Sequence, residues 1–131
     1  MKACFTAMIL ILSDNMRMRF NYLDDFLKDL KSLKKKIPSL EDDLKNFEKF
    51  IPGVDFGQNK RFVVLTEDTQ KQIKIIKTRL MVRSLKGSDK TRLIFSFCVH
   101  EDCVDFIELY LKNQKSREDE SRIEEYLKFK K

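Results

Sequence analysis

The alternation of apolar and polar residues between positions 73 and 99 constrains the fold more than any other feature of the sequence. Successive side chains of a strand point to opposite faces of a sheet, so a period of two predicts half-buried strands. Residues 73–84 and 91–99 both show this period, and residues 86–89 between them, KGSD, have the composition of a turn. The pattern therefore predicts two neighbouring strands that pair in antiparallel fashion.

The same alternation predicts which side chains share a face. The side chains predicted to face the core are Ile76, Thr78, Leu80, Val82, Leu93, Phe95, Phe97 and Val99. The opposite face, which we expect to be uncovered, carries the cations Lys77, Arg79, Arg83 and Arg92. Like charges opposite each other destabilise a sheet. We therefore expect this face either to be fully solvated or to bind an anionic partner.

A third alternating segment, residues 103–112, predicts a strand that follows the first two. Its predicted faces hold Ile107, Leu109 and Leu111 on one side and Phe106, Glu108, Tyr110 and Lys112 on the other. If this strand pairs next to the second one, Tyr110 and Lys112 join the cationic face.

The rest of the chain predicts the remaining elements of an α+β fold. Residues 17–22 and 61–65 predict short strands, residues 23–51 a helical hairpin, and the segment from Ser116 onward a helix. The expected architecture is an N-terminal strand and a helical hairpin packed on a curved antiparallel sheet, with a C-terminal helix.

The net charge of +6 is concentrated in the middle of the chain. Residues 53–99 contain ten Lys or Arg and four Asp or Glu, which equals the excess of the whole chain. A concentrated positive field attracts phosphates and polyanions, but many basic proteins bind no nucleic acid. Charge alone therefore leaves nucleic-acid binding and plain solvation open.

The chain of 131 residues is short enough for one domain, which we place at residues 16–131. Residues 1–15 include the apolar run ACFTAMILIL, which is too short to span a bilayer. Because Met16 and Met18 follow it, we interpret residues 1–15 as an N-terminal extension that could lie upstream of the true start. An extra edge strand or a short anchor is the alternative interpretation.

The cysteines Cys4, Cys98 and Cys103 and the single histidine, His100, form no CxxC pair and no recognisable metal-ligand spacing. This pattern argues against a disulfide framework and against a structural zinc site. It fits a reducing cytoplasm. We expect no metal, no cofactor and no membrane partner.

Three segments, taken in this order along the chain, are similar to segments of a known family: RFNYLDDFLKDLKSLKKKIPSLEDDL, KTRLMVRSLKGSDKTRLIFSF and FIELYLKNQKSREDESRIEEYL. The K-x-R strand, the Lys/Gly loop, the R-L-I-F strand, the I-x-L-Y-x-K strand end and the closing acidic helix resemble the RelE/ParE toxin superfamily, in particular its RelE/HigB-like branch. The resemblance extends from about Arg17 to the C-terminus.

This resemblance implies a toxin of a type II toxin–antitoxin system that acts in the cytoplasm as a ribosome-dependent mRNA endoribonuclease. In that chemistry the ribose 2′-OH attacks the adjacent phosphate and expels the 5′-oxygen, while Lys and Arg side chains stabilise the developing charge. The implied partners are mRNA on the ribosome and an antitoxin protein, encoded next to the toxin, that wraps the sheet with an acidic segment.

The resemblance also implies the site residues. The catalytic set is Lys77, Arg79, Arg92 and Lys112. Arg92 matches a phosphate-binding arginine, and Lys77 and Arg79 match the positions of a proton acceptor and a second phosphate contact. Neighbouring cations would lower the pKa of a lysine and so suit it to act as a base.

The residues implied to bind RNA are Arg83, Lys86, Tyr110, Lys115 and Arg117. Asn113 stands where many RelE members carry an arginine that acts as a general acid, so Lys115 and Arg117 are the candidate replacements. Two alternatives stay open: a ParE-like toxin that poisons DNA gyrase, and a relative that binds RNA or protein without catalysis.

Overall fold

The residues described by a computed structural model are 18–56, 58–82 and 91–130. The expected N-terminal extension, residues 1–15, and the predicted turn at residues 86–89 lie outside the described residues. The same holds for Arg83 and Lys86, two of the residues expected to bind RNA.

One five-stranded sheet with the strand order β1-β5-β4-β3-β2 runs through the molecule. The strands are β1 (Arg19–Tyr22), β2 (Val63–Asp68), β3 (Ile73–Arg79), β4 (Thr91–Cys98) and β5 (Cys103–Leu111). The pairs β2–β3, β3–β4 and β4–β5 are antiparallel, which confirms the pairing predicted from the alternation. β1 pairs in parallel with β5. The sheet is therefore mixed, whereas we expected an antiparallel sheet.

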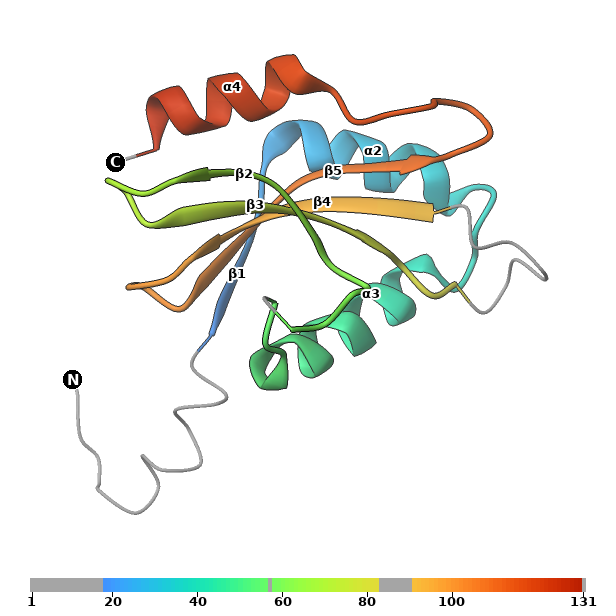
Figure 1. The fold of residues 1–131 in the computed structure, drawn as a ribbon. Helices are drawn as coiled ribbons and strands as arrows, with labels where there is room; N and C mark the ends of the chain where they lie inside the picture. The colour runs from blue at the N-terminus through green and yellow to red at the C-terminus, as the bar shows by residue number, and fades with distance from the viewer. Residues whose placement is uncertain (1–17, 57, 83–90, 131) are drawn as a thin grey trace.

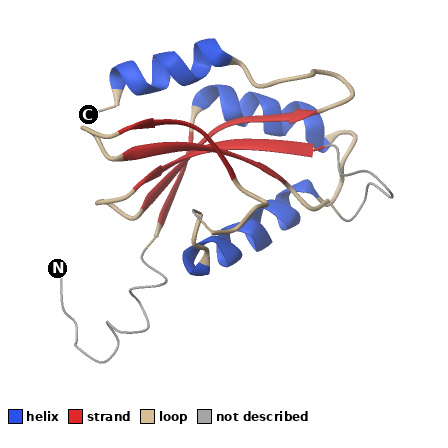
Figure 2. Cartoon of the chain, in the orientation of Figure 1, coloured by secondary structure: helices blue, strands red, loops and turns tan. Residues whose placement is uncertain are grey.

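The helices of the described residues lie on both sides of this sheet. They are α2 (Asp24–Lys34), α3 (Leu40–Phe50), the short 3-10 helix η1 (Ile51–Gly53) and α4 (Glu120–Phe129). α2 and α3 form the predicted helical hairpin, and Figures 1 and 2 show α3 and α4 on opposite sides of the strands. The predicted α+β class and the predicted C-terminal helix are both confirmed.

The helical hairpin buries one apolar stripe from each helix, because apolar residues recur every three or four positions. The buried stripe residues are Phe26, Leu30, Leu33, Leu40, Leu44 and Phe47. They close a core around Phe106 of β5, which is fully buried. The Phe106 ring centroid lies 5.2–6.3 Å from those of five neighbouring rings: Phe20, Tyr22, Phe26, Phe47 and Phe95.

Where β5 pairs with β4, β5 contains one residue more than β4. Ile94 pairs with Glu108 and Phe95 with Phe106, so Ile107 is an extra residue that forms a β-bulge. The alternation changes phase at this point: Phe106 faces the helical hairpin, whereas Ile107 faces the opposite side. The faces predicted for Phe106 and Ile107 from a strict period of two are wrong for this reason.

The bulge is held by side chains from two helices. The backbone N–H of Leu109 donates to Asp29 of α2 at 3.1 Å, and the carbonyl of Ile107 accepts from Arg122 of α4 at 3.2 Å. Arg122 also binds both carboxylate oxygens of Asp29, at 2.6 and 3.1 Å. Backbone groups released by the bulge therefore gain partners, and α2 is tied to α4.

The face of the sheet opposite the hairpin has a core of its own. Its buried members are Ile73, Ile75, Ile94, Cys98, Cys103, Ile107, Tyr110, Ile123 and Tyr126. Ile123 and Tyr126 come from α4, so the expectation that this face is uncovered is wrong where the helix lies. Ile123 and Tyr126 of α4 are buried, and Leu127 packs beside them.

Within residues 18–130, apart from the gaps given above, no helix has the length and apolar character that crossing a membrane requires.

We predict that Phe106→Ala lowers the free energy of unfolding by about 3–5 kcal/mol, because it removes a buried ring from the centre of the aromatic core. Urea denaturation followed by circular dichroism measures this change. Phe129→Ala is the control, because Phe129 is 69% exposed and its removal should cost less than about 0.5 kcal/mol. Equal losses in the two variants would contradict the described core.

Candidate functional site

Three of the expected site residues form a row across the sheet. Arg79, the last residue of β3, pairs with Arg92 of β4, and Arg92 pairs with Tyr110 of β5. Directly paired residues share a face, so the structure places these side chains together as the alternation predicted. Arg79 is exposed, whereas Arg92 is only 8% exposed and Tyr110 only 5%. The row therefore runs from solvent into the interior.

A second row lies beside the first and introduces an acidic residue. Lys77 of β3 pairs with Ile94, and Ile94 pairs with Glu108 of β5. Lys77 Nζ also donates to Glu118 Oε1 at 2.9 Å, and the Glu118 side chain is only 11% exposed. The face expected to be cationic thus contains two carboxylates that neutralise part of its charge.

Glu108 connects the site to the start of α4. Its carboxylate is almost completely buried and accepts from Lys115 Nζ and, at 2.7 Å, from the backbone N–H of Asp119. Asp119 is the N-cap of α4 and accepts from the first backbone N–H groups of that helix. The Lys115 ammonium lies 5.6 Å from the centre of the Tyr110 ring, so Lys115 lies beside the first row.

The pKa of Lys77 is displaced in the opposite direction to the expectation. Burial by itself lowers this pKa, but the hydrogen bond with Glu118, the neighbouring Tyr110 hydroxyl and the charge of Glu118 together outweigh burial, so the pKa of Lys77 lies above its ordinary value. The expected lowered pKa is therefore wrong for this arrangement. A lysine with a raised pKa stays an ammonium at neutral pH and acts as a cation or a proton donor.

The remaining predicted residues lie at the rim. Lys112 follows Leu111, the β5 residue paired with Thr91, and its side chain is exposed, as is that of Asn113. Arg117 is also exposed and forms an ion pair with Glu120. The segment from Lys112 to Asp119 runs from the end of β5 to α4, and Figure 1 shows this connection passing around one end of the sheet.

Sequence reasoning missed the role of the two acids. The period of two placed Glu108 on the correct face, but nothing in the sequence indicated its contact with Lys115. Glu118 lies in the run REDE, and the sequence does not distinguish it from the other acidic residues of that run. Only the folded chain brings Glu118 to Lys77, which is 41 positions away.

The arrangement suits the binding of an anion at one end of the sheet. An exposed arginine, a half-buried lysine and a nearly buried arginine converge there from two neighbouring strands. Guanidinium groups bind phosphate oxygens through two parallel hydrogen bonds. Glu118 is the competing anion that a phosphate would have to displace from Lys77.

The comparisons with known proteins agree with the fold. The structure is similar to a chain of the crystal structure of the archaeal RelE–RelB complex from Pyrococcus horikoshii OT3, with a TM-score of 0.52 and 18% sequence identity. The match covers 73% of this chain and 96% of that chain. No protein-family model and no curated protein matches the sequence. The chain therefore has a RelE-like fold.

We predict that Glu118→Gln destabilises the protein at neutral pH, by about 1–3 kcal/mol, because it removes the charge that pairs with Lys77. Burial by itself raises the pKa of Glu118, but the hydrogen bond from Lys77 outweighs burial and lowers that pKa. A lowered folded-state pKa gives stability above the unfolded-state pKa that is lost as the pH falls through the folded-state value.

The difference in unfolding free energy between the wild type and Glu118→Gln should therefore vanish in acid, as measured by urea denaturation from neutral pH downward. Glu120→Gln is the matched control, because Glu120 forms an exposed ion pair with Arg117 and should contribute less. A difference that persists unchanged through the acid range would contradict the proposed cause.

Proposed function

We propose that the protein is the toxin of a toxin–antitoxin system and cuts mRNA on the ribosome. The observation that carries this proposal is the row of Arg79, Arg92 and Tyr110, with Lys77 beside it, at one end of a RelE-like sheet. The resemblance of the sequence motifs to the RelE/HigB-like branch supports the same function. The site contains no histidine, so the chemistry falls to lysine and arginine side chains.

In the proposed reaction, the ribose 2′-oxygen attacks the adjacent phosphorus, and the bond from phosphorus to the 5′-oxygen breaks. The products are a 2′,3′-cyclic phosphate and a 5′-hydroxyl, so the 2′-OH loses one proton, to solvent water, and the leaving 5′-oxygen gains one. Negative charge builds on the phosphate oxygens during this step. Arg79 and Arg92 stabilise that charge as fixed donors.

The environment of Lys77 suits it to act as a cation and as a proton donor. Because the pKa of Lys77 is raised, we assign it as a cation that contacts phosphate and can supply the proton to the leaving 5′-oxygen. This role fills the gap left by Asn113 at the position of the general acid. Lys112, Lys115 and Arg117 would extend the basic surface along the RNA strand.

The proposed partners are ribosome-bound mRNA and an antitoxin. The RelE–RelB neighbour is itself a complex of two proteins, which supports an antitoxin partner for this chain. An acidic antitoxin segment would compete for the same arginines as RNA. Binding of the antitoxin would then neutralise the toxin by occupying its phosphate site.

We predict that Arg79→Ala lowers the rate of mRNA cleavage by about 10²–10³-fold, because it removes one donor to the charge of the transition state. Arg79 is exposed, so the variant should fold normally. Arg92→Lys is the second variant: it keeps the charge in the interior but loses the two-pronged contact with phosphate. Growth arrest on expression and mapping of mRNA 5′ ends measure the effect.

Lys128→Ala is the control, because Lys128 is an exposed cation of α4 outside the two rows. It should leave arrest and cleavage unchanged. Arrest that survives both arginine variants would refute the assigned site. Accumulated gyrase cleavage complexes with intact mRNA would favour the ParE-like alternative, and ribosome binding without any cut would favour the non-catalytic one.

A further inference from the structure

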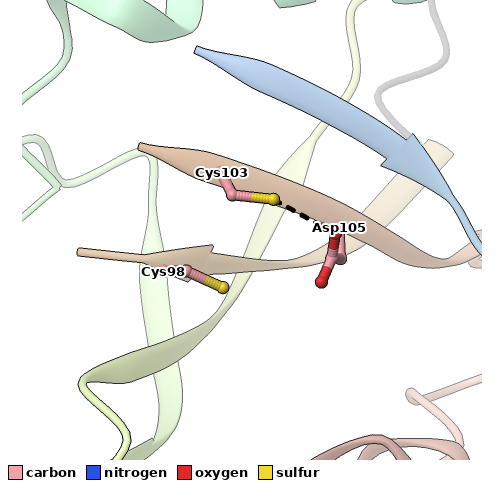
Figure 3. A group of neighbouring side chains, drawn as sticks. All are labelled: Cys98, Cys103 and Asp105. Carbon is pink, nitrogen blue, oxygen red and sulfur yellow. Dashed lines mark hydrogen bonds between the residues drawn. The ribbon is translucent and has the colours of Figure 1, made fainter. Parts of the chain in front are cut away.

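A cluster of two thiols and a carboxylate lies at the other end of β4 and β5. Cys98 is the last residue of β4, Cys103 is the first residue of β5, and the two are direct partners in the ladder. Asp105 follows two residues later and therefore points to the same face. Figure 3 shows the three side chains extending from the two neighbouring strands into one space.

The ligand atoms of this cluster are close enough to share one ion. The two Sγ atoms and a carboxylate oxygen of Asp105 all lie within 4.8 Å of one another, and all three residues are buried. Zinc–sulfur bonds of about 2.3 Å in a tetrahedron place two sulfurs about 3.8 Å apart. Cys103 Sγ already lies 3.4 Å from Asp105 Oδ1.

Neighbouring donors already orient these ligand atoms. The Asn21 side-chain amide donates to Cys103 Sγ at 3.2 Å and to Asp105 Oδ1 at 2.9 Å. The Tyr126 hydroxyl donates to Asp105 Oδ2 at 2.6 Å and lies 3.8 Å from Cys98 Sγ. Such outer donors hold metal ligands in position in known sites.

The charges of the cluster also balance with a divalent cation. Two thiolates and one carboxylate carry three negative charges, a divalent cation supplies two positive ones, and Lys130 Nζ lies 3.1 Å from Asp105 Oδ2. Both thiols must lose their protons to bind the ion as thiolates. Metal binding would release these protons.

An entry path reaches the carboxylate side of the cluster. A cavity of about 690 Å³ opens between the start of α2 and α4, and its lining includes Asn21, Asp105, Tyr126 and Lys130. A zinc ion with three protein ligands keeps a fourth position for water. The cavity can supply that water from the side of Asp105.

We propose that Cys98, Cys103 and Asp105 form a binding site for a thiophilic divalent cation of the Zn²⁺ class. The spacing of the cysteines in the sequence argued against such a site, but the hairpin from β4 to β5 brings them face to face. The site is separate from the proposed RNA site, because Arg92 and Cys98 are six strand residues, or about 20 Å, apart.

The proposed ion would fasten α4 to the sheet. Asp105 already joins the sheet to α4 through Tyr126 and Lys130. A metal bound to Asp105 would fix this carboxylate and, through it, the C-terminal half of the helix. This proposed attachment of α4 to the sheet does not depend on the proposed function.

The test is a titration of the reduced full chain with Co²⁺ and with Zn²⁺. We expect one ion per chain, a cobalt–thiolate charge-transfer band, and loss of that band on addition of Zn²⁺. Cys98→Ser and Cys103→Ser should each abolish the band. Asn21→Ala should weaken the affinity by about 10–100-fold, as changes of outer donors do.

Two controls separate this site from other ligands of the chain. Cys4→Ser removes the third cysteine and His100→Ala removes the exposed histidine of the turn between the two strands, and both should bind as the wild type does. X-ray absorption spectroscopy of the zinc-loaded wild type does not depend on the folding of any variant. It should show two sulfur neighbours of the zinc ion at about 2.3 Å. Absence of binding, a zinc shell without two sulfurs, or loss of binding in either control would overturn the proposal.

Discussion

The single extra residue in β5 sets the geometry of the rest of the molecule. Without the bulge at Ile107, the period of two would send Phe106 and Leu109 to opposite faces, and the hairpin core could not contain both. With it, both side chains pack under α2 and α3. By the same shift of phase, Glu108 and Tyr110 stand in the two rows, where they pair with Ile94 and Arg92.

Acids pair with two of the cations of the site: Glu118 with Lys77, and Glu108 of β5 with Lys115. Arg79 and Arg92 lie directly opposite each other, an arrangement that costs free energy unless negative charge is near. Glu108 and Glu118 bring negative charge to the neighbouring row, in a partly buried setting where ion pairs are screened less than at the surface. The resting site is therefore closer to neutral than the composition of residues 53–99 indicates.

The sequence predicted the helices and strands better than it predicted the contacts between them. Alternation was sufficient for the pairing of β3 and β4, because neither strand has a bulge where the two pair. It was insufficient for β5, because a bulge leaves no mark in the pattern of residue types. The parallel pairing of β1 and the contact of Lys77 with Glu118 depend on residues 84 and 41 positions apart, and no local signal reports such distances.

The contact of Asp29 with Arg122 affects how strands of other molecules can associate with the edge of the sheet. β1 pairs only with the first part of β5, from Cys103 to Phe106, so the rest of β5 would form an open sheet edge. Open edges are templates on which strands of other molecules add. Asp29 and Arg122 bind the Leu109 N–H and the Ile107 carbonyl on this stretch, so association through it would first require the two-pronged ion pair to separate.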